Sequence, residues 1–108
     1  MMFMEKNLRK FTEKQLLEFN GSDSAKPIYL AIKGTVFDVT ASRETYTPPK
    51  GYSVFAGRDA SKALGKSSLK PEDCIADFSE LDNEQLSTLN KWVEFFTNKY
   101  PVVGIMSF

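Results

Sequence analysis

Two β-rich runs, at residues 28–32 and 35–40, restrict the fold more than any other feature of the chain. Both are rich in β-branched and aromatic residues, which favour strands. Only Lys33 and Gly34 separate them, and a two-residue connection containing glycine is typical of a tight hairpin. The sequence therefore predicts a β-hairpin over residues 28–40.

Helix signals lie on either side of this hairpin. Thr12 and Gln15 have the spacing of a capping box, and so do Asp82 and Gln85. After the second box, apolar residues recur at steps of three and four and predict one long helix that ends at Pro101; they are Leu86, Leu89, Val93, Phe96 and Tyr100. Residues 102–106 then predict a terminal strand. Because helices and strands segregate, the fold class is α+β.

The remaining boundaries are set by smaller signals. Asp59 is a suitable N-cap for a short helix at residues 60–64, and Gly65 stands where a C′ glycine belongs. The length of 108 residues indicates one domain. We expect residues 1–10 to be a flexible lead-in and residues 11–108 to form the domain. The single cysteine, Cys74, is expected to be a small buried thiol.

Charge and residue counts exclude several functional classes. Fourteen Lys and Arg residues balance fourteen Asp and Glu residues, so no overall field attracts nucleic acid. No apolar run approaches the roughly 18 residues that indicate a membrane-spanning helix. The chain has no histidine, which excludes a Ser-His triad and a histidine metal site. Because a phosphate loop and a dinucleotide fingerprint are missing too, we expect a protein that is not an enzyme.

The stretch at residues 46–65 is the best candidate for a binding site. Tyr46 and Tyr52 flank a turn that contains two prolines and a glycine, and an apolar run follows. Rigid surface loops that hold polar aromatic rings are common places for binding groups. Each tyrosine taken alone is also compatible with simple packing, because a buried ring with a wet hydroxyl is its ordinary state.

Several motifs give this chain a family resemblance. Residues 32–40 resemble the hairpin motif of the cytochrome b5-like superfamily, and residues 52–64 resemble the signature of its membrane-associated progesterone receptor branch. Trp92 and residues 99–104 also match that branch, so the resemblance covers residues 11–104. It implies a cytochrome b5-like fold, in which a small mixed sheet and short helices form a haem cleft. The signature reads Tyr52-x-x-Phe55-Ala56-Gly57-Arg58-Asp59-Ala60-Ser61-x-Ala63-Leu64.

The resemblance also implies a set of site residues. Tyr52 matches the tyrosine that is the axial ligand of haem iron, and Tyr46 matches a second tyrosine that hydrogen-bonds the ligand oxygen. Lys99 and Tyr100 match a pair that contacts the haem edge. The cofactor would be haem b, five-coordinate and ferric. This agrees with basic chemistry, because tyrosine is an established haem ligand and bonding to iron stabilises the phenolate.

The implied function is haem binding in support of sterol metabolism, through contact with microsomal monooxygenases or haem delivery to them. An exposed haem face would allow a haem-mediated homodimer. The expected location is the cytoplasmic side of the cell, with possible association of the full-length protein with the endoplasmic reticulum membrane. Two alternatives stay open: a module that binds sterols or small lipids without haem, and a protein-interaction domain that has lost the cofactor.

Overall fold

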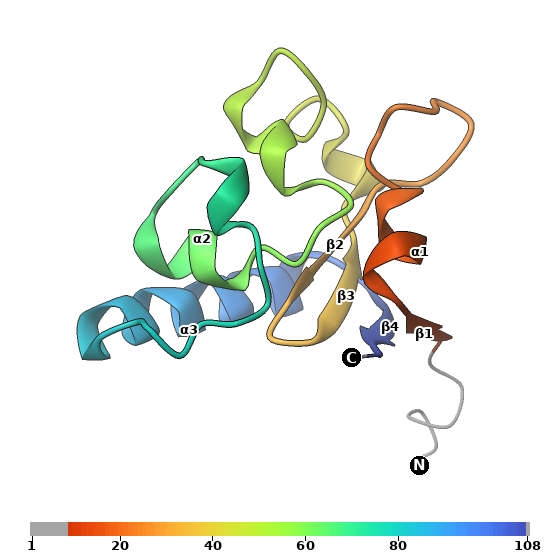
Figure 1. Cartoon of the computed structure of the whole chain (residues 1–108). Helices are drawn as coiled ribbons and strands as arrows, with labels where there is room; N and C mark the ends of the chain where they lie inside the picture. Colours follow the sequence, from red (N-terminus) through yellow and green to blue (C-terminus); the bar gives the residue numbers. More distant parts are fainter. Residues whose placement is uncertain (1–8, 108) are drawn as a thin grey trace.

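The predicted hairpin lies at the centre of the computed structural model, which describes residues 9–107 (Figure 1). Strand β2 (Tyr29–Ile32) pairs antiparallel with β3 (Thr35–Asp38). Both residues of the connection have positive φ, 51° at Lys33 and 82° at Gly34. A two-residue hairpin turn of the primed type has this geometry, because it matches the twist of the strands. The hairpin prediction is confirmed.

Two further strands complete a mixed sheet with the order β1-β4-β3-β2. The predicted terminal strand is β4 (Val102–Met106), which runs antiparallel to β3 and parallel to β1 (Arg9–Phe11). A Cβ on Gly104 would lie 2.3 Å from the Arg9 carbonyl oxygen, so glycine is needed where β1 approaches β4. The flexible lead-in predicted for residues 1–10 is therefore too long, because ordered pairing begins at Arg9. Residues 1–8 lie outside the described part of the chain.

Both predicted capping boxes are present. Helix α1 (Glu13–Leu17) begins after Thr12, and α3 (Asn83–Lys99) begins after Asp82. In each helix, the side chain of the cap residue accepts a hydrogen bond from the backbone N–H of the glutamine three residues later. The side chain of that glutamine accepts one from the backbone N–H of the cap residue. The amide of Tyr100 closes α3 on the Phe96 carbonyl at 2.9 Å. Proline follows directly and has no N–H with which to continue the helix.

The sheet separates two apolar cores. On one face, side chains of β2 and β3 pack with α2 (Ser61–Lys66) and α3, and Phe37 and Phe96 are almost fully buried there. On the other face, Phe11 and Leu16 pack with alternate residues of the same strands beneath α1. Figure 1 shows α1 on one side of the sheet and α2 with α3 on the other. The period of two along each strand produces this division.

Helix α2 differs from its prediction at both ends. It starts at Ser61 rather than at residue 60, and Asp59 accepts from the Ser61 amide at 3.0 Å without being the N-cap. The left-handed C-cap is Ser67, not Gly65. Gly65 instead lies inside the helix, where a Cβ would lie 2.4 Å from Leu81 Cδ1. This glycine is needed for close packing rather than for ending the helix.

The free edge of β2 is covered by the segment that leads into α2. Gly57 donates from its amide to the Tyr29 carbonyl at 2.7 Å, Ala31 donates to Arg58, and Ala60 donates to Ala31. Pairing of this kind protects an edge strand and fixes the adjacent loop on a rigid support. The loops around it contain three 3₁₀ turns, which are η2 (Thr40–Ser42), η3 (Gly51–Phe55) and η4 (Pro71–Asp73).

Candidate functional site: a tyrosine cluster beside an apolar cleft

The loop between Tyr46 and Tyr52 is held by local hydrogen bonds. Thr47 Oγ1 donates to the Arg43 carbonyl at 2.8 Å, and the Lys50 amide donates to the Thr47 carbonyl at 3.2 Å. Because η3 begins directly after this turn, Tyr52 returns beside Tyr46. Their ring centres are 6.3 Å apart with an angle of 29° between the planes, a stacked arrangement. Two residues six positions apart in sequence thus form one aromatic surface.

The two rings differ in their exposure to solvent. Tyr46 is 3% exposed and belongs to the main core, whereas Tyr52 is 39% exposed. The ring of Tyr52 also packs against Phe55, with 5.5 Å between the ring centres. Tyr52 is therefore held by aromatic neighbours while a large part of its side chain faces solvent.

Tyr100 and Lys99 extend this cluster from the end of α3. The Tyr100 hydroxyl donates to Ser42 Oγ at 2.8 Å, which joins the end of α3 to η2. Lys99 Nζ lies 5.6 Å from the centre of the Tyr100 ring and 5.4 Å from that of Phe95. The described ion pairs involve other lysines and do not include Lys99, so its charge is available to an anionic ligand.

The environment keeps the buried phenol of this cluster neutral. Burial raises the pKa of Tyr46 above its ordinary value of 10.0, and its interactions with Tyr100, which include a hydrogen bond, raise the pKa further. The neighbouring Tyr52 adds a smaller electrostatic contribution in the same direction. The Tyr46 phenol thus stays neutral across the physiological range.

An apolar cleft of about 240 Å³ opens beside Tyr52. Its lining comes from η3, from α2 and the loop after it, and from α3; the lining residues are Tyr52, Phe55, Ala63, Leu64, Ser67, Ser68, Leu69 and Trp92. Tyr52 also borders a shallower polar hollow, which is formed by Glu44, Thr45, Lys50 and Gly51. The phenol therefore stands between an apolar cleft and a polar rim.

The structure brings the four predicted site residues together, with one difference in detail. Tyr52 stacks on Tyr46, Tyr46 interacts with Tyr100, and Lys99 lies over Tyr100. The expected hydrogen bond from Tyr46 to the Tyr52 oxygen is not among the described contacts, in which the Tyr100 hydroxyl bonds Ser42. That bond stays a prediction for the ligand-bound protein. Burial of Cys74, which is 7% exposed, agrees with its expected role as an inert thiol.

Sequence reasoning missed three members of the site. Ser42 receives the Tyr100 hydrogen bond, while Leu69 and Trp92 line the cleft. Trp92 was named only for its family match, because aromatic spacing alone cannot separate a core residue from one that lines a cleft. Leu69 is half exposed in a loop. The one signal in the sequence that could have identified it as a site residue was its apolar side chain in an otherwise polar loop.

The donor set agrees with haem as the ligand. The chain has no histidine, and within residues 9–107 no cluster of three acidic, cysteine or histidine side chains could hold a bare metal ion. The site offers one accessible phenol oxygen, an apolar cleft and an unpaired lysine. A phenolate is an established axial ligand, apolar walls suit the porphyrin, and an ammonium suits a propionate.

Comparison with known proteins places the chain in a family. Residues 12–104 match the family described as cytochrome b5-like heme/steroid binding domain. A probable steroid-binding protein 3 of Arabidopsis thaliana is 50% identical over 95 residues, which cover 88% of this chain and 95% of that protein. A solved Arabidopsis thaliana structure described as having a cytochrome b5-like fold has a TM-score of 0.86 at 46% identity, covering 99% of this chain and 98% of the other.

Other relatives are longer than this chain. A membrane steroid-binding protein 2 of Oryza sativa is 45% identical over 95 residues, covering 88% of this chain and 36% of that protein. A cytochrome P450 regulator of Schizosaccharomyces pombe is 42% identical over 103 residues, covering 89% of this chain and 61% of that protein. Because the match spans nearly the whole domain and the fold agrees, the chain belongs to the cytochrome b5-like haem/steroid-binding domains, in the membrane-associated progesterone receptor family.

Proposed function

We propose that this domain binds haem b, with the Tyr52 phenolate as the axial ligand of ferric iron. One observation carries the proposal: in a chain without histidine, Tyr52 alone of the clustered tyrosines is exposed, and it lines an apolar cleft. The buried phenols of Tyr46 and Tyr100 face neighbouring hydroxyl groups instead. When bound, the haem would supply an iron centre with one open face.

The residues around Tyr52 each have a part in holding such a group. Phe55 and Trp92 offer apolar walls to the porphyrin, and Tyr46 fixes the ring of Tyr52 by stacking. Lys99 offers its charge to a propionate, and Tyr100, next to it at the end of α3, would contact the haem edge. A cleft of about 240 Å³ is smaller than the roughly 300–1,000 Å³ of pockets that enclose a drug-sized ligand. Much of the group would therefore face solvent.

Hemin titration of the Tyr52→Phe variant tests the ligand assignment. Wild-type protein should give the absorption spectrum of a high-spin ferric tyrosinate complex, and the variant should lose that spectrum with at least a hundredfold loss of affinity. The free energy of unfolding should change by less than about 0.5 kcal/mol, because the hydroxyl is exposed. Tyr29→Phe is the matched control, since Tyr29 lies beneath α1 on the other face of the sheet. An unchanged spectrum in Tyr52→Phe would refute the assignment.

A role beside monooxygenases follows as part of the proposal. One relative is named a cytochrome P450 regulator and others are named steroid-binding proteins, which supports a binding role, not an enzymatic one, in sterol metabolism. A haem face left open would allow contact with a monooxygenase or with a second copy of the domain. Within residues 9–107, no helix is long and apolar enough to cross a bilayer. Association of the full-length protein with the cytoplasmic side of the endoplasmic reticulum is part of this proposal.

Direct steroid binding is the second candidate, because the family description and the relatives' names include it. The same apolar cleft would then receive a steroid or small lipid in place of haem. Titrating a sterol into haem-free protein separates the two functions. Saturable binding that persists unchanged in Tyr52→Phe, together with failure to load hemin, would favour the steroid.

A further inference from the structure

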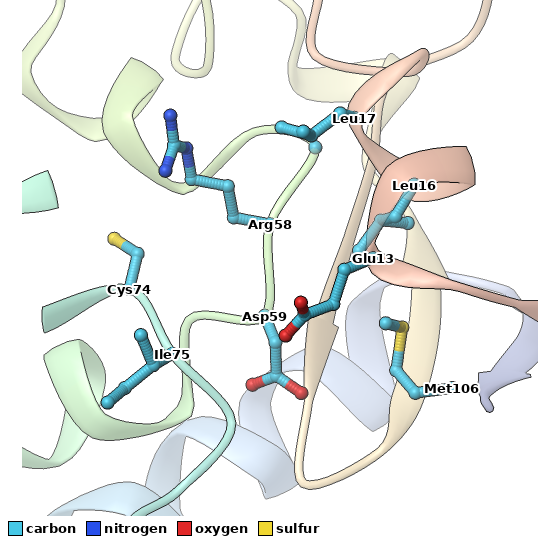
Figure 2. Close-up of a pocket in the computed structure, with 9 residues that line it drawn as sticks. Glu13, Leu16, Leu17, Arg58, Asp59, Cys74, Ile75 and Met106 are labelled. Atoms are coloured by element: carbon cyan, nitrogen blue, oxygen red, sulfur yellow. The ribbon is translucent and has the colours of Figure 1, made fainter. Parts of the chain in front are cut away.

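A second hollow of about 240 Å³ lies between α1 and the segment that covers the edge of β2. We call it the acidic pocket; the residues used below are Glu13, Leu16, Leu17, Asp59, Ile75 and Met106 (Figure 2). It shares no lining residue with the cleft beside Tyr52 or with the polar hollow next to it. The haem proposal leaves it without a role.

Asp59 is the unusual residue of this pocket. Its side chain is 5% exposed, and its Oδ1 accepts from both the amide and the hydroxyl of Ser61. Its Oδ2 is buried and has no hydrogen-bond partner among the described residues. The two oxygens of Asp59 therefore differ: Oδ1 accepts hydrogen bonds from the first turn of α2, and Oδ2 accepts none from the described residues. Buried polar atoms are normally paired, so an unpaired one indicates a missing partner.

A second carboxyl group faces the same space. Figure 2 shows Glu13 of α1 directing its carboxyl group toward that of Asp59, while Arg58 extends its guanidinium away from both. Burial raises the pKa of Asp59, hydrogen bonds from Ser61 partly oppose this, and the charge of Glu13 raises it further. The Gly34 amide lies close enough to lower this pKa slightly, but it makes no hydrogen bond to Oδ2. Neither carboxyl group is held in an ion pair by the described residues.

Apart from Arg58, Gly57 and the Cys74 thiol, the other residues that line the pocket are apolar. Leu16 and Met106 are buried, whereas Leu17 and Ile75 are large hydrophobic residues left about 40% exposed at its rim. A ligand that fits would combine a cationic hydrogen-bond donor with a short apolar body. A water molecule could donate a hydrogen bond to Oδ2, but it would not bury the exposed apolar surface of Leu17 and Ile75.

We propose that the acidic pocket binds a small primary ammonium ligand with a short aliphatic body. Its ammonium group would donate to Asp59 Oδ2 and to the Glu13 carboxylate, and its hydrocarbon part would cover Leu17 and Ile75. Charge-assisted hydrogen bonds are the strong ones, and an ammonium has three donors to share between two carboxylates. The volume restricts the ligand to a few carbon atoms, or to the end of a longer amine.

Three isosteric probes test this in ¹⁵N NMR titrations of the haem-free domain at pH 7: n-butylammonium, 1-butanol and butyrate. We expect saturable shifts for n-butylammonium, centred on the amides of residues 57–59, Leu17 and Ile75. 1-Butanol should bind at least fivefold more weakly, and butyrate should give no saturable shift. Equal responses to the amine and the alcohol would overturn the proposal, and so would the absence of saturation with the amine, which would leave only water in the pocket.

Variants assign the effect to the two carboxylates. Glu13→Gln should weaken n-butylammonium about two- to fivefold, as expected for an exposed ion pair. Glu18→Gln is the matched control on α1, because Glu18 pairs with Lys26 outside the pocket, and it should bind as wild type does. Asp59→Asn keeps an oxygen for Ser61 and should weaken binding about tenfold. If Glu13→Gln and Glu18→Gln behave alike, the pocket does not recognise the ammonium.

Tyr52→Phe separates this proposal from the proposed function. The two sites share no lining residue, so the variant should bind n-butylammonium as wild type does, whatever it does to hemin. Loss of amine binding in Tyr52→Phe would contradict a separate site.

Discussion

The two hollows have similar volumes, about 240 Å³ each, and present their polar groups in opposite ways. Tyr52, which lines the cleft, has an exposed phenol, while the phenol of the neighbouring Tyr46 is buried. In the acidic pocket, the free group is the buried Oδ2 of Asp59. An exposed donor atom needs little desolvation before it binds a large flat ligand. A buried one favours a small ligand that can enter and replace the missing partner.

Gly57→Ala should have the largest effect, because Gly57 lines the acidic pocket only two residues after Phe55, which lines the cleft. Gly57 has a φ of 75°, and an added Cβ would lie 2.6 Å from Asn20 Cβ and 2.9 Å from its Cα. Backbone strain and this clash should together lower the free energy of unfolding by about 2–4 kcal/mol in urea titrations. Gly34→Ala is the control, since its φ is 82° with nothing within 4 Å; strain alone should cost about 1 kcal/mol. Equal losses would exclude the clash with Asn20.

The second-largest effect should be a loss of folding stability at alkaline pH that originates at the acidic pocket. Burial raises the pKa of the Cys74 thiol, beside the acidic pocket, from 9.0 to about 11. The neutral thiol therefore contributes its full stability below pH 9, and that contribution is lost as the pH rises through 11. Urea titrations at pH 8 and 10.5 should show wild type losing roughly 1–2 kcal/mol more than Cys74→Ala. Parallel losses in both proteins would show that Cys74 is not the titrating group.

Tyr46→Phe tests whether the buried phenol supports the exposed one. Removing a buried, hydrogen-bonded hydroxyl should cost about 0.5–1.5 kcal/mol of unfolding free energy. Hemin affinity should fall about tenfold, as for a group that supports a metal ligand, while n-butylammonium binding should stay unchanged. Tyr29→Phe serves again as the control in absorption titrations. A Tyr46→Phe protein with wild-type hemin affinity would limit Tyr46 to a packing role.

Lys99→Gln should have the smallest effect. An exposed lysine that pairs with a propionate should contribute about two- to threefold in hemin affinity, and the difference should shrink as salt is added. Lys91→Gln is the matched control, because Lys91 is exposed on the same helix. Identical salt-dependent losses in the two variants would show that the position of Lys99 beside the site does not matter.

Sequence patterns predicted those elements whose signals are local. The hairpin turn at Lys33 and Gly34, and the capping boxes after Thr12 and Asp82, need only neighbouring residues, and all three are confirmed. The strand at Arg9 was missed because a three-residue strand has no period of its own and depends on pairing with β4. Gly65 was misread because its contact, Leu81, lies sixteen residues away.

The residues of the candidate site likewise divide into those that the sequence could select and those that only the structure shows. The family motif at residues 52–64 and the lack of histidine were enough to select Tyr52, Tyr46, Lys99 and Tyr100, whose roles as haem contacts stay predictions. Ser42 could not be selected, because its bond to Tyr100 joins residues 58 positions apart. The unpaired oxygen of Asp59 was equally hidden, since Asp59 has the sequence features of an ordinary N-cap.

By itself, the sequence determined the hairpin, the capped helices, the α+β class and the family, because each depends on residue types at fixed short spacings. Only the tertiary structure decided which tyrosine is exposed, which oxygen of Asp59 is left unpaired and where the two hollows open. Exposure and hydrogen-bond satisfaction depend on how α1, α2 and α3 pack on the two faces of the sheet. Such packing sums contacts between distant residues, which no local pattern records.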